Sequence, residues 1–293
     1  MTCAPDSPAG PSDAASPYEP AAPAPGARPA RPVRVHHLTR AKERGERLTM
    51  LTAYDAVTAR ILDEAGTDML LVGDSIGNVM LGHDTTLPVE LDEMVVATRS
   101  VARATARALV VADLPFGTYE AGPEQALSSA VGLIKAGANA VKLEGGRPRA
   151  NAIRALTEAG IPVMGHLGFT PQSVNALGGF RVQGRGEAGE ELLADALAIQ
   201  EAGVMAMVLE MVPEPVAARV TEALAVPTIG IGAGARCDGQ VLVWSDMAGM
   251  TEWRPRFAKR FGRVGEALRR AACDYAAEVR EGAFPAEEHW FDS

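Results

Sequence analysis

Short apolar runs alternate with longer helical stretches along most of the chain, and no other feature constrains the fold as much. Each run is too short for a helix and too uniformly apolar for a strand with one wet face, which is typical of strands buried on both faces. Eight such units predict an α/β fold with a parallel sheet. The runs are Leu48–Tyr54, Met69–Val72, Ala108–Ala112, Ala140–Leu143, Ile161–Met164, Met205–Leu209, Pro227–Ile231 and Val241–Trp244.

The stretches between the runs have the features of helices. Four of them end in Ala-Gly, at Gly66, Gly137, Gly160 and Gly203. Glycine just past the last helical residue is a common helix stop, and a buried strand follows shortly each time. The predicted helices include Ala56–Ala65, Leu91–Thr105, Glu124–Ala136, Glu190–Ala202 and Glu214–Ala225.

Residues 1–33 differ from the rest because they hold nine of the chain's 20 prolines and are otherwise mostly Ala, Ser and Gly. We expect a disordered Pro/Ala-rich tail here, since such a segment buries too little apolar surface to offset its ordering entropy. The remainder is about 260 residues, close to the roughly 250 typical of one (β/α)8 barrel. The sequence therefore predicts a TIM-barrel catalytic domain over residues 34–293, with one or two extra C-terminal helices within Arg254–Arg280.

Charge and cysteine usage exclude several classes of protein. The net charge is −9 and the Lys and Arg residues are not clustered, which argues against a nucleic-acid partner. No apolar run approaches the roughly 18 residues of a membrane helix. The cysteines, Cys3, Cys237 and Cys273, stand in no ligand spacing, and the first thirty residues show no secretory signal pattern. We expect a cytoplasmic enzyme that does not bind membranes.

Polar residues stand where successive predicted strands end. In a (β/α)8 barrel these ends share one rim, and active sites of this fold are built there. Each residue alone has a structural explanation: a turn or helix cap for an Asp, an ion pair for Lys142 with Glu144, a core position for His166. Their joint occurrence at one rim favours a functional site. The residues are Asp74 and Ser75, Asp113, Lys142 and Glu144, His166, and Glu210.

The chemistry of this set points to a divalent cation and an oxo acid. Asp74, Asp113 and Glu144 supply hard oxygen ligands without thiolates, which suits Mg²⁺. A 2-oxo acid chelates such an ion through its carboxylate and keto oxygens, and the ion stabilises the enolate formed by loss of the adjacent proton. Lys142 adds positive charge for the anionic substrate. Glu210 lies in an apolar run, so we expect a raised pKa and a role as general base.

Several motifs resemble the ketopantoate hydroxymethyltransferase family, in order, from about Arg47 to Phe291. The resemblance implies a barrel that transfers a hydroxymethyl group from 5,10-methylenetetrahydrofolate to 2-oxoisovalerate (3-methyl-2-oxobutanoate), giving 2-dehydropantoate for pantothenate synthesis. The motifs are residues 52–55 (TAYD), 72–75 (VGDS), 82–88 (GHDTTLP), 112–116 (ADLPF), 141–146 (VKLEGG), 165–173 (GHLGFTPQS), 182–186 (VQGRG) and 229–234 (IGIGAG).

The resemblance also implies roles for the residues at the rim. Asp74 and Asp113 would hold Mg²⁺, with Glu144 contributing directly or through water. Together with these two aspartates, Ser75, Lys142 and His166 would bind the oxo acid. Glu210 would remove the C3 proton as the catalytic base. Members of the family are homo-oligomers, commonly decamers.

Two other functions stay open at this point. One is a Mg²⁺-dependent lyase or mutase of the phosphoenolpyruvate mutase/isocitrate lyase type, which shares the barrel but uses a loop cysteine; Cys237 is a poor match. The other is a barrel that binds folate or oxo acid without catalysis. The chain also departs from the family pattern at Met211, where many relatives carry Cys, and at residues 250–255, which bear on folate affinity if they meet the folate.

Overall fold

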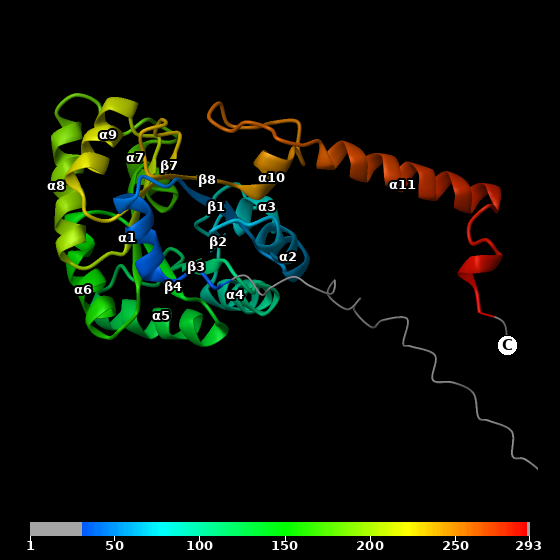
Figure 1. Cartoon of the computed structure of the whole chain (residues 1–293), viewed down its shortest axis with the longest axis horizontal. Coiled ribbons are helices and arrows are strands. Elements are labelled where there is room, and N and C mark those ends of the chain that lie inside the picture. The colour runs from blue at the N-terminus through cyan, green and yellow to red at the C-terminus, as the bar shows by residue number, and fades with distance from the viewer. Residues whose placement is uncertain (1–30, 292–293) are drawn as a thin grey trace, which may run out of the picture. The chain divides into compact units, whose positions relative to one another are not determined.

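Eight parallel strands form one closed barrel in the computed structural model, which describes residues 31–291 (Figure 1). Each strand pairs with its neighbours in chain order, and β8 pairs with β1 to close the ring. The predicted (β/α)8 fold is confirmed. The strands are β1 (Leu48–Thr52), β2 (Met69–Val72), β3 (Leu109–Asp113), β4 (Ala140–Glu144), β5 (Val163–Gly168), β6 (Ala206–Glu210), β7 (Thr228–Ile231) and β8 (Gly239–Leu242).

Within the described residues, at least one helix connects each strand to the next except between β7 and β8, and the helices cover most of the outside of the barrel (Figure 1). The four glycines predicted to end helices all have positive φ, between 81° and 116°, so the αL helix stop is confirmed. The helices are α1 (Val35–Glu43), α2 (Ala56–Glu64), α3 (Ile76–Val79), α4 (Leu91–Ala104), α5 (Pro123–Ala136), α6 (Ala150–Glu158), α7 (Val174–Leu177), α8 (Ala188–Glu201), α9 (Glu214–Ala223), α10 (Trp244–Ala248) and α11 (Val264–Glu281), with 3-10 turns η1 (Arg147–Arg149), η2 (Pro171–Ser173) and η3 (Glu287–His289).

Some boundaries differ from those predicted. β5 continues to Gly168 because the barrel pairs this segment with β6, a tertiary effect that local composition does not reveal. β8 begins at Gly239, and Trp244 starts α10 instead of ending a strand. The C-terminal segment contains one long helix, α11, which begins ten residues later than the predicted Arg254.

The predicted tail, residues 1–33, lies outside the described residues except for its last three. Of these, Val33 donates its N–H to the carbonyl of Arg107 at 2.7 Å, so it is tied to the start of β3. No helix within residues 31–291 is long and apolar enough to cross a membrane.

Alternation along the strands divides the apolar residues into two layers. In β3, Val110 and Ala112 point outward to the helices, whereas Leu109 and Val111 fill the inside of the barrel. The same division runs around the ring. The interior set includes Met50, Met69, Leu71, Leu109, Val111, Ala140, Met164, Ala206, Val208, Ile229, Ile231 and Val241.

Helix α1 closes the N-terminal end of the barrel. Leu38 is fully buried and belongs to the interior apolar set. Lys42 on the same helix donates to Asp238, just before β8, at 2.8 Å, and to the carbonyl of Thr221 at 2.7 Å. Asp238 in turn accepts the N–H of Thr228 at the start of β7 at 2.8 Å. The helix is thereby fastened to strands on one side, and through Val33 to β3 on the other.

The outer wall of the barrel is exposed at one place, between β8 and β1. Thr49 on β1 and Gln240 on β8 are exposed, whereas β2, β3, β4 and β7 are buried on both faces. Val57 and Ile61 of the adjacent α2 are 72% and 61% exposed. The short α10 follows β8, and the long α11, which comes next in the chain, has no buried residue and leaves this flank uncovered.

We predict that Asp238→Ala destabilises the fold by about 2–4 kcal/mol, because it leaves the mostly buried Lys42 ammonium and the Thr228 N–H without their partner. Urea unfolding measures the change. Glu46→Ala is the matched control, since it breaks the exposed Arg44–Glu46 pair, which should contribute little. Equal effects of the two substitutions would contradict the role assigned to Asp238.

Candidate active site at the barrel mouth

The alternation of the strands directs the predicted site residues into the barrel. Asp113 continues the interior series of Leu109 and Val111, and Glu210 continues that of Ala206 and Val208. The same parity holds for Lys142, Glu144 and His166. All five stand at or near the carboxyl ends of their strands, where the barrel brings them to one mouth.

Asp74 and Asp113 lie side by side at the ends of β2 and β3. The Asp74 N–H donates to Asp113 Oδ2 at 3.0 Å. Burial raises the pKa of Asp74 well above its ordinary value, and the charges of Asp113 and Glu144 raise it further. Burial also raises the pKa of Asp113, although Lys142 and the Asp74 N–H oppose the change. These shifts mean that keeping Asp74 and Asp113 ionised side by side is electrostatically unfavourable.

Lys142 is the central cation of the site. Its Nζ lies 3.1 Å from Asp113 Oδ1 and 3.3 Å from His166 Nδ1, and the side chain is buried. Burial opposes the charged form, but the carboxylates of Asp113, Glu144 and Asp74 outweigh it and raise the pKa of Lys142. Lys142 is therefore a fixed positive charge at the bottom of the mouth.

His166 lies between two carboxylates. Its Nδ1 is 3.3 Å from Glu144 Oε1, and its Nε2 is 3.2 Å from Glu210 Oε2. Burial and the Lys142 ammonium lower the pKa of His166, but its contacts with Glu144 and Glu210 outweigh them and raise it to about 9. The two carboxylates thus favour the protonated imidazole, whereas the Lys142 ammonium, 3.3 Å from Nδ1, opposes it.

Glu210 is held by its backbone at the last position of β6. The Phe169 N–H donates to the Glu210 carbonyl at 2.8 Å. This approach requires glycine at the paired position, because a Cβ on Gly168 would lie 2.2 Å from that carbonyl oxygen. Met211 then adopts φ of 48°, unusual for a residue other than glycine, and turns the chain away. With 16% exposure, the Glu210 side chain is the carboxylate of the site most open to solvent.

Ser75 stands at the edge of this group. Its Oγ lies 2.8 Å from the hydroxyl of the buried Tyr54. Gly73 lies close to both Ser75 and Asp113. A Cβ added at Gly73 would come 2.8 Å from Ser75 Oγ and 3.5 Å from Asp113 Oδ2. The structure thus brings six predicted residues into one cluster and places the seventh, Ser75, beside it.

Sequence reasoning missed two residues of the site, Tyr119 and Gln172. Gln172 follows β5 in η2 and contacts both Asp74 and Glu144. Tyr119 lies in the segment between β3 and α5 and hydrogen-bonds to Gln172. Both are buried polar side chains on connecting segments, where no strand periodicity marks them. The one available signal was the position of Gln172 inside the motif at residues 165–173.

The donor set fits a divalent cation. Asp113 Oδ1 and Glu144 Oε1 are buried and have no aligned hydrogen-bond partner, although cationic side chains are near. Four carboxylates surround Lys142 and His166, and a divalent cation would offset part of their negative charge. Among the described residues, no three His, Cys, Asp or Glu side chains form a ready-made ligand group. Mg²⁺ is commonly bound through one or two carboxylates and keeps several waters, and the oxygens of Asp113 and Glu144 are donors of that type.

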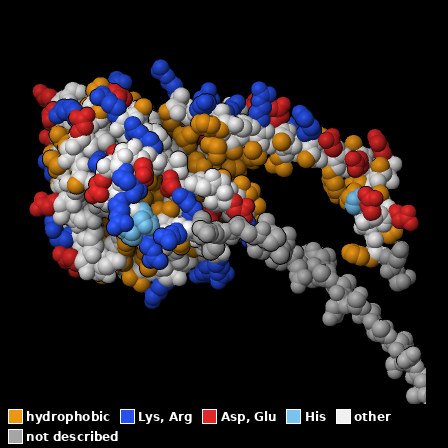
Figure 2. All heavy atoms as spheres, viewed as in Figure 1, with side chains coloured by type: hydrophobic (Ala, Val, Ile, Leu, Met, Phe, Trp, Pro, Cys, Tyr) orange, Lys and Arg blue, Asp and Glu red, His pale blue; other side chains and the backbone are white. Residues whose placement is uncertain are grey.

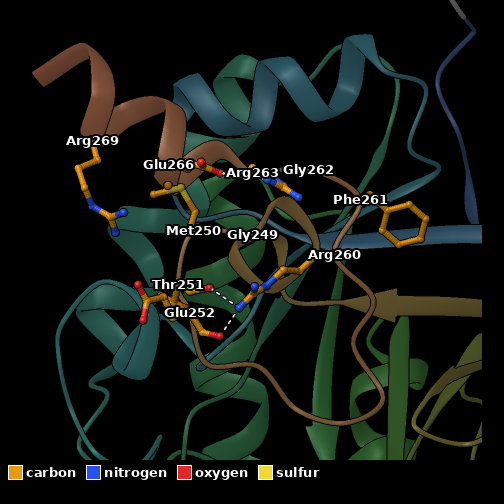
Figure 3. A pocket seen from close by; sticks show the side chains of 11 residues that line it. Gly249, Met250, Thr251, Glu252, Arg260, Phe261, Gly262, Arg263, Glu266 and Arg269 are labelled. Carbon is orange, nitrogen blue, oxygen red and sulfur yellow. Dashed lines mark hydrogen bonds and ion pairs between the residues drawn. The ribbon is translucent and has the colours of Figure 1, made fainter. Parts of the chain in front are cut away.

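A separate cavity of about 570 Å³ lies at the root of α11 (Figure 3). Met250, Thr251 and Glu252 form one side of it, and Arg260 donates to the carbonyls of Thr251 and Glu252. None of the carboxylates of the site lines this cavity. The first part of the divergent segment, residues 250–252, therefore packs against the start of α11. An effect of this segment on folate affinity stays a prediction.

Cys237 is not part of the site. It is buried just before β8, so it belongs to the N-terminal end of the barrel, opposite the mouth. A cysteine there cannot serve as the loop cysteine of the lyase alternative.

Comparison with known proteins identifies the family. The family model for ketopantoate hydroxymethyltransferase matches residues 32–287. A protein of Rhodococcus jostii named 3-methyl-2-oxobutanoate hydroxymethyltransferase is 61% identical over 260 residues, covering 88% of this chain and 90% of that protein. A protein of the same name from Mycolicibacterium vanbaalenii is 60% identical over 258 residues, covering 87% and 92%.

Among solved structures, phosphonopyruvate hydrolase in complex with oxalate and Mg²⁺ aligns with a TM-score of 0.57 at 14% identity, over 87% of this chain and 92% of that one. At this identity the likeness shows the fold alone. A 2,3-dimethylmalate lyase of the phosphoenolpyruvate mutase/isocitrate lyase superfamily likewise aligns with a TM-score of 0.54 at 18% identity, over 88% of this chain and 91% of that one. The lyase alternative therefore shares the architecture of the chain, and the match in sequence decides between the alternatives. The chain is an enzyme and belongs to the ketopantoate hydroxymethyltransferase family.

Proposed function

We propose that the enzyme transfers a one-carbon unit from 5,10-methylenetetrahydrofolate to 2-oxoisovalerate and forms 2-dehydropantoate, in the pathway to pantothenate. The observation that carries this proposal is the arrangement of the mouth. Asp113 and Glu144, each with one oxygen that has only a cationic side chain near it, lie on one side, and the more open Glu210 lies on the other side of His166 from Glu144. The names of the relatives support the same reaction.

The oxo acid is held by the cations at the bottom of the mouth. Lys142 and His166 would bind its carboxylate and keto oxygens, and Ser75 would donate a hydrogen bond from the edge. Asp74 and Asp113 would hold Mg²⁺, with Glu144 contributing directly or through water. Mg²⁺, when bound, supplies Lewis acidity to the oxygens of the oxo acid.

Glu210 accepts the C3 proton of the oxo acid. Its carboxylate is oriented by His166 Nε2 and faces the opening, where the reacting carbon of a bound substrate lies. The methylene carbon of the folate is bonded to two folate nitrogens, and both carbon–nitrogen bonds break. Water forms a carbon–oxygen bond to this carbon and releases it from the folate at the oxidation level of formaldehyde, and the carbon nucleophile forms the new carbon–carbon bond to it. The C3 proton and one proton of the water replace the methylene carbon on the two folate nitrogens.

The direct test is an assay of 2-oxoisovalerate with methylenetetrahydrofolate, with and without EDTA. We expect 2-dehydropantoate, and loss of the product in EDTA. Formation of an oxo acid by cleavage of hydroxy acids such as isocitrate would favour the lyase alternative instead. Absence of any product in a single turnover would favour a barrel that only binds its ligands.

We predict that Glu210→Gln slows the exchange of the C3 hydrogen of 2-oxoisovalerate with deuterated solvent by about 10²–10⁴-fold, the usual contribution of a positioned general base. Proton NMR in the presence of Mg²⁺ and without folate isolates this step. Glu187→Gln, an exposed glutamate away from the cluster, is the control. Exchange at the wild-type rate in the Glu210 variant would exclude this residue as the base.

We also propose that the enzyme is a homo-oligomer, in which α11 packs on a second copy of the chain. The apolar residues of α11 form one stripe at helical spacing, Val264, Leu268, Tyr275 and Val279, and all four are 45–60% exposed. Figure 2 shows hydrophobic side chains gathered along one side of this helix. The flank formed by β1, β8 and α2 is exposed in the single chain. If two copies exchanged their α11 helices, the apolar stripe of each helix and the exposed flank of the other copy would both be buried.

We predict that Leu268→Glu lowers the mass of the assembly in solution, because a charge in the stripe cannot be buried against a partner. Light scattering after size-exclusion chromatography measures the mass and also gives the number of subunits, for which the family resemblance implies ten. Ala277→Glu adds the same charge on the opposite face of α11 and should leave the mass unchanged. A wild-type monomer at micromolar concentration would refute the assembly.

We place the enzyme in the cytoplasm, since Cys237 and Cys273 are free thiols of the kind that a reducing compartment permits. Measurement of activity in separated cell fractions tests this location.

A further inference from the structure

Gln172 is a buried amide whose polar atoms all have partners in the site. Its side-chain Nε2 donates to Asp74 Oδ2 at 2.8 Å and to the carbonyl of Leu114 at 3.0 Å. Its Oε1 accepts from the hydroxyl of Tyr119. Its backbone N–H donates to Glu144 Oε2 at 3.0 Å. One residue therefore touches two of the three carboxylates that we assign to Mg²⁺.

The orientation of this amide follows from its neighbours. Asp74 Oδ2 and the Leu114 carbonyl only accept hydrogen bonds, so the side-chain NH₂ group must face them. Oε1 then faces Tyr119, whose hydroxyl donates to it and whose oxygen accepts the Glu144 N–H at 3.3 Å. Tyr119 thus fixes which end of Gln172 points at Asp74. Only a neutral amide at position 172 can fill this place, because a carboxylate could not donate to Asp74.

The consequence for the carboxylates is a fixed rotation. Each has one oxygen bound to Gln172, Asp74 through Oδ2 and Glu144 through Oε2. The other oxygen of Glu144 has no aligned partner and lies on the side of His166. Gln172 therefore fixes the rotation of Glu144, so that Oε1 points to the interior beside His166, and it links Asp74 to Glu144 through one residue.

We propose that Gln172, oriented by Tyr119, is a positioning residue that presents Asp74 and Glu144 to the divalent cation. This inference rests on the proposed function for its metal ion, and it adds two residues that act through the ligands. Partners that orient metal ligands commonly account for about 10–100-fold in metal affinity.

The test is Mn²⁺ binding to the full-length enzyme without substrate, measured by the electron paramagnetic resonance signal of free Mn²⁺. Gln172→Met keeps the length of the side chain and removes its hydrogen bonds, and we expect affinity to fall about 10–100-fold. Tyr119→Phe should weaken binding less and in the same direction. The double variant should bind only slightly more weakly than Gln172→Met, because Tyr119 acts mainly through Gln172 and otherwise makes only a long contact of 3.3 Å with the Glu144 N–H.

Gln125→Met is the matched control. Gln125 hydrogen-bonds to Gly117 and Ala121 in the segment that carries Tyr119, but it touches none of the carboxylates, so Mn²⁺ affinity should not change. Thermal unfolding without metal shows that each variant is folded. If Gln172→Met does not fold, Tyr119→Phe carries the test.

The outcomes separate the two proposals. Wild-type affinity in a folded Gln172→Met, or in Tyr119→Phe if that variant carries the test, would overturn the positioning role and leave the proposed reaction standing. No Mn²⁺ binding by the wild-type enzyme would overturn the metal site itself, and the positioning role with it.

Discussion

The two-residue period of the strands, combined with closure of the barrel, decides which side chains meet at the mouth. The interior series on β3 and on β6 each end in a carboxylate, Asp113 and Glu210, and β4 adds Lys142 and Glu144 with the same parity. A shift of one residue in the pairing of any strand would turn its polar group outward against the helices. The charge arrangement of the site is therefore a consequence of strand register.

This dependence explains how much the sequence could predict. The barrel, its helix stops and the cluster of six polar residues follow from local patterns: short apolar runs, glycines after helices, and polar residues at strand ends. These patterns act within a few residues of the chain. The length of β5 could not be predicted, since pairing with β6, and not its own composition, carries that strand on to Gly168.

The other contacts of the site could not be predicted, because they depend on which distant segments of the chain meet. Tyr119 and Gln172 are 53 residues apart and meet only because the segments that follow β3 and β5 converge over the end of β4, the strand between them. The contact between His166 and Glu210 likewise depends on the pairing of β5 with β6. Helix α11 was expected from its composition, but its amphipathic pattern does not reveal that its apolar side is uncovered in a single chain.

Helix α1 covers the N-terminal end of the barrel, so ligands reach the site only from the mouth at the other end. Leu38 packs against the interior apolar residues at this end. Lys42 and Val33 hold the helix to the N-terminal ends of the strands through hydrogen bonds. Because Lys142 is buried below the mouth, a ligand bound against it would be covered by a second ligand bound above it. The deeper ligand would then enter before the second one and leave after it.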